Sequence, residues 1–262
     1  MKCDDLIRLL EQEVPLRAAE SWDNPGFLVG DRQKEVKKIM ITLDITNEVA
    51  EKAVEENVDF ILAHHPIIFS VIKQCTSDHF LQKKLLTLIG HGICCYGMHT
   101  NYDTCRMCQA AAKKLDFLPE APLLEASDQS LREENKGIGM IGSFKEEKSL
   151  GDFAKEIKKA FGLASAAVFG DIETKISRAA IVPGSGRGMA EAALQKGAQV
   201  LVTGDIGHHE GLDALDMGLC VIDAGHYGLE QVFIDDMEEL LKERLPECEW
   251  ITYKAGSPFQ II

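Results

Sequence analysis

Hydrophobic residues follow two kinds of pattern along this chain. Short runs of consecutive apolar residues, many of them Ile and Val, are typical of buried strands. They predict strands at residues 38–44, 58–63, 93–97, 137–144, 166–169, 176–182, 200–203 and 220–223. Between these runs, apolar residues recur every three or four positions, as on one face of a helix. This spacing predicts a first helix that ends at Pro15, and further helices at residues 47–56, 80–89, 103–115, 150–161, 189–195, 211–216 and 227–244.

Strands that alternate with helices predict an α/β fold with largely parallel sheets. We expect two related, interlocked α/β lobes within a single domain that spans residues 1–262. The lobes would cover residues 1–118 and 137–262, and the polar stretch 119–136, which contains two prolines, would connect them. Residues 166–169 and 176–182 are expected to form a strand pair.

A weak internal echo supports the idea of two lobes. In each half, a hydrophobic strand leads to a pair of histidines, His64-His65 in the first and His208-His209 in the second. Each pair is followed by a helix and another strand, which lead to Asp103 and to His226 respectively. The echo suggests related lobes that face each other across a cleft.

Composition narrows the class of partner. The 262 residues include 28 Lys and Arg against 42 Asp and Glu, so the net charge is −14. Such an acidic chain repels phosphate backbones, and nucleic acid is therefore not an expected partner. A small-molecule substrate remains open, although an anionic one would need local neutralisation by metal.

The N-terminus shows no signal-peptide pattern, and no apolar stretch reaches the roughly 18 residues that suggest a membrane span. We therefore expect a cytoplasmic protein without membrane association, whose eight cysteines are reduced. Cys105 and Cys108 have the spacing of a redox or zinc motif. On a helix and without a second such pair, they are better interpreted as buried thiols.

Residues with metal-binding side chains follow several of the predicted strands. His64 and His65 end one strand, and Pro66 holds the backbone of His65 extended. An isolated pair of this kind is more often a capping or surface pair. Because ligands of open α/β sheets bind at the carboxyl ends of strands, this position favours a functional role.

Asp103 follows another strand at a predicted helix start, where a plain N-cap is the ordinary alternative. His226 and Glu230 are four residues apart, so a helix would place them on one face, as in many exposed polar pairs. Imidazole and carboxylate together suit zinc, iron, manganese or nickel rather than calcium. Five ligands exceed the needs of one catalytic zinc, so we expect two divalent ions, about 3.5–4 Å apart.

The chain resembles a known family in five motifs, which occur in the expected order over essentially its whole length. They are Trp22-Asp23-Asn24-Pro25-Gly26, Ala63-His64-His65-Pro66, His99-Thr100-Asn101-Tyr102-Asp103, Thr203-Gly204-Asp205 and Gly225-His226-Tyr227-Gly228-Leu229-Glu230. The family is the GTP cyclohydrolase I type 2-like family, also called NGG-interacting factor 3-like or dinuclear-metal-centre hexameric proteins.

The resemblance implies the family's dinuclear metal centre fold, in the compact form without an inserted domain. It implies a toroidal homohexamer, a trimer of dimers, with two metal ions in each subunit. The implied metal ligands are His64, His65, Asp103, His226 and Glu230. The GTP cyclohydrolase label does not by itself establish the reaction.

Two functions remain open at this point. The first is a metal-dependent hydrolase that attacks a nucleotide or similar small molecule through a metal-bound hydroxide. His208 and His209 would then contact substrate or transfer a proton, unless they only cap a helix. The alternative is a non-catalytic role in metal storage or delivery, or as a ring-shaped scaffold.

Three further features bear on the site. Asp44 could orient a ligand histidine. The loop that begins at Trp22 could line the mouth of the site. The glycine-rich turn at residues 184–188 could cradle phosphate, but a plain tight turn is the simpler interpretation.

Overall fold

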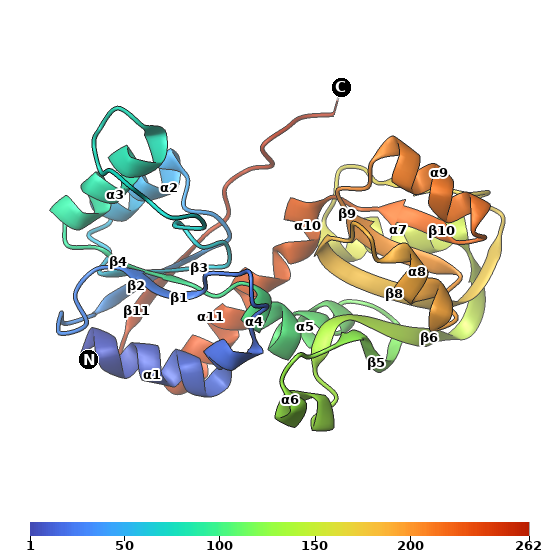
Figure 1. Ribbon diagram of the computed structural model, residues 1–262, viewed down its shortest axis with the longest axis horizontal. Helices are drawn as coiled ribbons and strands as arrows, with labels where there is room; N and C mark the ends of the chain where they lie inside the picture. The colour runs from blue at the N-terminus through green and yellow to red at the C-terminus, as the bar shows by residue number, and fades with distance from the viewer. Residues whose placement is uncertain (262) are drawn as a thin grey trace. The chain divides into compact units, whose positions relative to one another are not determined.

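The computed structural model describes residues 1–261, which form two compact units (Figure 1). Unit 1 comprises Met1–Tyr102 and Phe233–Gly256, and unit 2 comprises Asp103–Val232 and the end of the chain from Ser257. Each unit is built on a mixed α/β sheet with a parallel centre, which confirms the predicted fold class. The units do not follow the expected boundaries, because residues Phe233–Gly256, which hold nearly all of the last helix and the strand after it, belong to unit 1.

Unit 1 contains a five-stranded sheet. Its strands, in spatial order, are β1 (Gly26–Val29), β4 (Cys94–Gly97), β3 (Phe60–Ala63), β2 (Lys38–Thr42) and β11 (Glu249–Tyr253). Only β1 runs antiparallel to its neighbour. The helices around it are α1 (Cys3–Glu13), η1 (Leu16–Ala18), α2 (Asn47–Glu55), α3 (Phe80–Gly90), α4 (Thr100–Tyr102) and α11 (Val232–Arg244).

The sheet of unit 1 is covered on both faces. Figure 1 shows α2 and α3 on one face, with α1 and α11 on the other. Met40, Ile61 and Cys95 of the strands pack in one buried cluster with Val49 of α2 and Leu88 of α3. Strands covered on both sides read as continuous apolar runs, which is why the sequence revealed them.

Unit 2 contains a six-stranded sheet. Its strands, in spatial order, are β5 (Leu118–Glu125), β6 (Gly137–Ser149), β8 (Lys175–Ser185), β9 (Val200–Gly204), β10 (Cys220–Asp223) and β7 (Ala167–Phe169). The centre, β8-β9-β10, is parallel, and β5, β6 and β7 pair antiparallel. Its helices are η2 (Asp103–Met107), α5 (Cys108–Ala112), α6 (Gln129–Glu133), α7 (Leu150–Phe161), α8 (Ala190–Gln195), α9 (His208–Asp216) and α10 (His226–Glu230).

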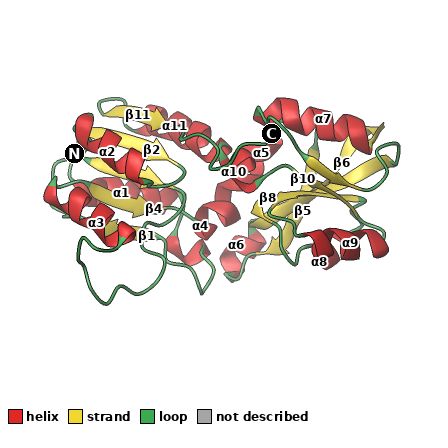
Figure 2. Ribbon diagram, turned by 90° about the horizontal axis from the view of Figure 1, so that it is seen from above, coloured by secondary structure: helices red, strands yellow, loops and turns green. Residues whose placement is uncertain are grey.

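Alternate residues of β9 face two separate cores. Val200 and Val202 pack with Phe153 of α7, whereas Leu201 packs with Ala193 of α8 and Ala214 of α9. Figure 2 shows the same arrangement, with α7 on one side of this sheet and α8 and α9 on the other. The period of two along a strand produces this division.

Three expectations from the sequence are corrected. Residues 119–136 are not a simple connector, because they hold most of β5 and all of α6, and β5 pairs with β6. Strands β7 and β8 do not pair with each other: β7 pairs with β10, and β8 with β6 and β9. The single helix expected at residues 103–115 is divided into the π-helical turn η2 and the short α5.

The two units share one strand order. In unit 1, β2, β3 and β4 are parallel neighbours and β1 pairs antiparallel with β4; in unit 2, β8, β9 and β10 are parallel neighbours and β7 pairs antiparallel with β10. The backbone N–H of Met98 bonds to the carbonyl of Ala63, and that of Ala224 bonds to Thr203 in the same way. Ala63 and Thr203 therefore occupy equivalent positions.

The equivalence corrects one detail of the internal echo. Gly204 and Asp205, not His208 and His209, occupy the positions equivalent to His64 and His65. The second histidine pair lies three residues beyond Asp205, at the start of α9.

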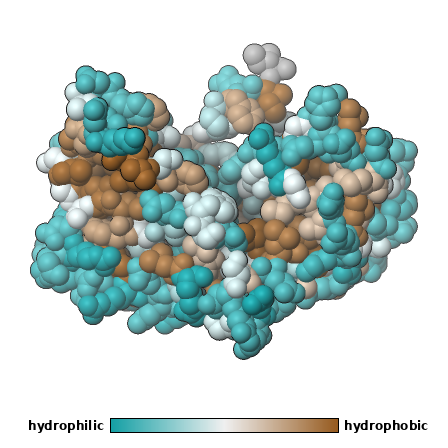
Figure 3. Space-filling model, in the orientation of Figure 1, coloured by the Kyte–Doolittle hydropathy of each residue, from teal (hydrophilic) through white to brown (hydrophobic). Residues whose placement is uncertain are grey.

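Within residues 1–261, no helix is long and apolar enough to cross a bilayer. The face of the molecule seen in Figure 3 intersperses hydrophilic and hydrophobic residues.

Candidate metal centre

His64 and His65 follow β3 directly, and each is fixed through its Nδ1 atom. His64 is fully buried, and its Nδ1 lies 2.7 Å from the carbonyl oxygen of Met98. The Nδ1 of His65 lies 2.8 Å from Oδ1 of Asp44, the residue expected to orient a histidine. Carbonyl and carboxylate oxygens only accept hydrogen bonds, so Nδ1 of each ring carries the proton. Nε2 is then the nitrogen of each ring that can offer a lone pair to a metal, an arrangement typical of ligand histidines.

The backbone around these histidines is closely packed. A Cβ added to Gly97, at the end of β4, would lie 2.9 Å from the Cα of Pro66. Only glycine at this position allows the turn after His65 to lie against the neighbouring strand. The rigid ring of Pro66 limits the backbone on the other side of His65.

His226 is the first residue of α10, and its ring is also held through Nδ1. Its Nδ1 lies 2.9 Å from Oδ2 of Asp205, so the Nδ1 proton is donated there. Its Nε2 lies 3.0 Å from Oε2 of Glu230, one helical turn later. Two atoms that bind one ion at about 2.1 Å in adjacent positions lie about 3 Å apart. The pair therefore fits a shared cation, or else an imidazolium held between two carboxylates.

Two glycines make room for this pair. An ideal Cβ on Gly184 would lie only 2.4 Å from Oε1 of Glu230, and one on Gly204 only 2.3 Å from the backbone nitrogen of His226. Gly184 also has a φ of +85°, which favours glycine. The glycine-rich turn that could have cradled phosphate is thus explained in part by the space that the Glu230 carboxylate needs.

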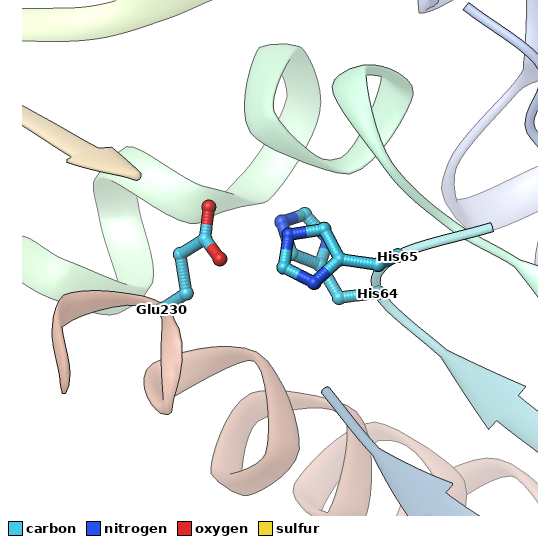
Figure 4. Close-up of side chains that lie close together, drawn as sticks. All are labelled: His64, His65 and Glu230. Carbon is cyan, nitrogen blue, oxygen red and sulfur yellow. The ribbon is translucent and has the colours of Figure 1, made fainter. Parts of the chain in front are cut away.

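His64, His65 and Glu230 form a candidate metal-binding group. One ligand atom from each of the three lies within 4.8 Å of the others, and Figure 4 shows the two imidazoles and the carboxylate close together. Within unit 1, the ring of Phe233 packs 5.1 Å from the ring of His64.

The other predicted site residues have different surroundings. Asp103 begins η2, directly after Tyr102, whose ring lies 5.8 Å from that of His64. His208 and His209 are exposed at the start of α9, with their rings 5.2 Å apart. No contact described for residues 1–261 decides whether Asp103 is a ligand or whether the His208-His209 pair transfers protons, so both roles stay predictions.

A buried network beside the two histidines was missed from the sequence. The carboxylate of Asp23, whose side chain is fully buried, lies 2.8 Å from Nδ1 of His99 and accepts the backbone N–H of Thr100 at 3.0 Å. Burial raises the pKa of Asp23, but the hydrogen bonds from His99 and Thr100 outweigh it and lower the pKa to about 2. The ring of His99 lies 5.4 Å from that of His64.

The interpretation of Cys105 and Cys108 as buried thiols agrees with the structure for Cys105, whereas Cys108 is half-buried. Burial raises the pKa of Cys108 to about 12. A thiol that resists ionisation is a poor nucleophile and a poor metal ligand.

Fold and site together define a mixed α/β protein with a candidate metal-binding group of two histidines and a carboxylate. Residues 1–257 match the family Duf34/NIF3 (NGG1p interacting factor 3), and the chain belongs to this family.

Named relatives and solved structures agree. The chain is 34% identical to a GTP cyclohydrolase 1 type 2 homolog of Clostridium perfringens, over 100% of both chains. It is similar to the crystal structure of Staphylococcus aureus hypothetical protein SA1388, with a TM-score of 0.89, 31% identity and coverage of 100% of this chain and 99% of that one. Reduced HcgD from Methanocaldococcus jannaschii is also similar, with a TM-score of 0.82, 32% identity and coverage of 96% and 97%.

Proposed function

We propose that the protein is a metal-dependent hydrolase that acts on a nucleotide or a similar small molecule. The observation that carries this proposal is the group of His64, His65 and Glu230, whose ligand atoms lie within 4.8 Å of one another. The name of the Clostridium perfringens relative, a GTP cyclohydrolase 1 type 2 homolog, supports a nucleotide as the first substrate to test.

The proposed site holds two divalent ions, with His64, His65, Asp103, His226 and Glu230 as the ligands. The short distance between Nε2 of His226 and Oε2 of Glu230 supports adding His226 to the group. When bound, such ions would supply an acidified water for hydrolysis and neutralise an anionic substrate. That neutralisation is needed because the whole chain carries a net charge of −14.

The remaining side chains hold the ligand atoms in place. Asp44 and the carbonyl of Met98 fix the rings of His65 and His64, and Asp205 fixes that of His226. Each of these acceptors keeps the proton of its histidine on Nδ1, so Nε2 is the ring nitrogen that can bind a metal. Orientation of this kind raises the metal affinity of a site without any contact to the metal.

The test is turnover by protein whose metal content has been measured. GTP is offered first, followed by a panel of nucleotides, phosphoesters and amides, with zinc, iron, manganese and nickel loaded in turn. Turnover that disappears in Glu230→Gln supports the proposal. A flat panel from metal-loaded protein contradicts it, and metal that exchanges within seconds would then favour storage or delivery.

The family resemblance also leads us to propose that the chain assembles as a homohexamer. Sedimentation velocity of the purified protein tests this directly. A species of six chains is the expected result, and a monomer at micromolar concentration contradicts it.

A further inference from the structure

Two large aromatic side chains lie exposed beside the histidines of unit 1. Trp22 is 61% exposed and Phe69 is 52% exposed, and their ring centroids are 6.1 Å apart. The ring of His99 meets both of them edge-on, at 6.2 Å from Trp22 and 6.3 Å from Phe69. His99 also lies 5.5 Å from His65. One imidazole therefore separates the aromatic pair from the candidate metal ligands.

The loop that carries Trp22 is fixed on both sides. Before it, the backbone N–H of Glu20 donates to the hydroxyl of Thr100 at 3.0 Å. After it, the buried carboxylate of Asp23 is held by His99 and Thr100. The exposure of Trp22 is thus imposed by a network of hydrogen bonds and does not reflect a loosely held loop.

The loop that carries Phe69 is tied to the same network. The side-chain nitrogen of Asn24 donates to the carbonyl oxygen of Ile68, directly before Phe69, at 2.6 Å. Asn24 itself donates its backbone N–H to Asp23 at 2.7 Å. Both rings are therefore positioned before anything binds, which reduces the entropy lost on binding.

We propose that Trp22 and Phe69 form a stacking platform for the planar heteroaromatic ring of the substrate, beside the candidate metal ligands. This inference rests on the proposed function, because it assigns the nucleotide's base to this platform. Aromatic side chains can stack on any nucleobase, whatever polar groups the base carries, because every base presents a π-face. The centroids of Trp22 and Phe69 are too close for a ring to enter between them, and the two rings are tilted by 55°, so the base would stack on the outer face of one ring and contact the other at its edge.

His99 adds a polar contact at the edge of the platform. Its Nδ1–H donates to Asp23, so Nε2 is the ring nitrogen that can accept a hydrogen bond. A base with an N–H or an amino group at its edge, such as guanine, fits this acceptor. Guanosine 5′-monophosphate is therefore the probe.

The chain offers a direct optical readout, because it contains only two tryptophans, Trp22 and Trp250. In Trp250→Phe, Trp22 is the sole reporter, and guanosine 5′-monophosphate should quench it with saturation. Ribose 5-phosphate, which lacks the base, should not. In Trp22→Phe, Trp250 is the sole reporter and should show no saturable quenching.

Binding variants separate the platform from other roles. Calorimetry on metal-loaded protein should show that Trp22→Ala and Phe69→Ala each bind guanosine 5′-monophosphate about tenfold more weakly, with unchanged metal content. Phe80→Ala is the matched control, because Phe80 is 67% exposed in the same unit and its ring contact is with His79. This control should bind as the parent does.

Three outcomes overturn the platform: equal binding of ribose 5-phosphate, unchanged affinity in both alanine variants, or a change of sedimentation in Trp22→Ala with unchanged affinity. The last outcome would assign the aromatic pair to contacts between copies. Stacking without turnover would leave the platform standing while the hydrolase proposal fails. Turnover with an unchanged KM in Trp22→Ala would support the hydrolase proposal and contradict the platform.

Discussion

In unit 1 the middle parallel strand, β3, is followed directly by His64 and His65, whereas the equivalent strand of unit 2, β9, ends at Gly204 and is followed by Asp205. The histidines of unit 1 are themselves candidate ligands. In unit 2 the candidate ligands His226 and Glu230 lie on the helix after the next strand, and Asp205 supports one of them through Nδ1. The same strand order thus presents candidate metal ligands in unit 1 and, in unit 2, the carboxylate that accepts the hydrogen bond of the candidate ligand His226.

Small residues produce this difference. Gly204 lacks the Cβ that would collide with the backbone of His226, so α10 begins directly against the end of β9. In unit 1 the equivalent position holds the imidazole of His64. The topology fixes where side chains meet, and the size of the residue at each strand end decides which of them can reach a metal.

The largest expected effect comes from Glu230, the buried carboxylate of the candidate group. Glu230→Ala should weaken metal binding by about 100-fold or more, because a lost ligand exceeds the 10–100-fold cost of losing an outer partner. The fold should persist, and elemental analysis together with circular dichroism measures both. Glu238→Ala is the control, because Glu238 is a carboxylate on the next helix, α11, and pairs with Lys242. An unchanged metal content in Glu230→Ala would remove this residue from the site.

The space around that carboxylate can be tested without changing it. Gly184→Ala introduces a Cβ at 2.4 Å from Oε1 of Glu230, at a φ of +85°. We expect a loss of about 3 kcal/mol in the free energy of unfolding, from backbone strain and overpacking together, and a lower metal affinity.

Gly188→Ala supplies the matched control. Gly188 has a φ of +74°, but an added Cβ would meet nothing within 4 Å. It should cost only the strain, about 1 kcal/mol, and leave metal binding unchanged. Urea unfolding compares the two variants. Equal losses in the free energy of unfolding would mean that glycine is needed at position 184 only for its backbone conformation, and not for the space that it leaves to Glu230.

The sequence predicted the buried elements of both units well. Continuous apolar runs revealed β3, β9 and β10, because strands covered on both faces are built mainly of apolar residues. Edge strands were missed or misjudged for the same reason. β5 is exposed at Glu120 and Glu125 and reads as a polar connector, although its backbone pairs with β6.

Of the predicted site residues, His64, His65 and Glu230 lie together as a candidate group, because residue types and strand-end positions are informative. Among the groups that hold the candidate histidines, only Asp44 was anticipated from the sequence. The acceptor of His64 is the backbone carbonyl of Met98, and a backbone group cannot be recognised from the types of side chain in the sequence. Asp23 meets His99 across 76 residues of chain, a contact that local pattern cannot reveal. Asp205 stood at a strand end and could have been selected by the same rule as Asp44.

The buried network of unit 1 predicts a pH dependence of stability. The pKa of Asp23 falls from 3.8 to about 2 on folding, so its carboxylate stabilises the protein fully above the unfolded value. That contribution, about 2 kcal/mol, is lost as the pH falls through the folded value. Asp23→Asn should therefore cost about 2 kcal/mol at pH 7 and progressively less as the pH approaches 2.

Urea unfolding of metal-free protein in chelator measures this loss, because metal release at low pH would otherwise hide it. Asp152→Asn is the comparison, since Asp152 is an exposed acid of unit 2 whose pKa is also lowered, chiefly by Lys155. It should change the free energy of unfolding far less. A pH-independent loss in Asp23→Asn would mean that shape, and not charge, holds the Trp22 loop.

The smallest expected effects compare the two supporting acids directly. Asp44 orients His65 in unit 1 and Asp205 orients His226 in unit 2, at 2.8 and 2.9 Å. Both side chains are about half exposed, at 44% and 47%, so each should contribute similarly. Asp44→Ala and Asp205→Ala should each weaken metal binding about tenfold, measured by competition with a chelator. The corresponding Asn variants keep an oxygen that can accept the Nδ1 proton and should retain most of the affinity. If only the Asp44 variants respond, metal is held by unit 1 alone, and the His226–Glu230 pair is an imidazolium bridge rather than part of the metal site.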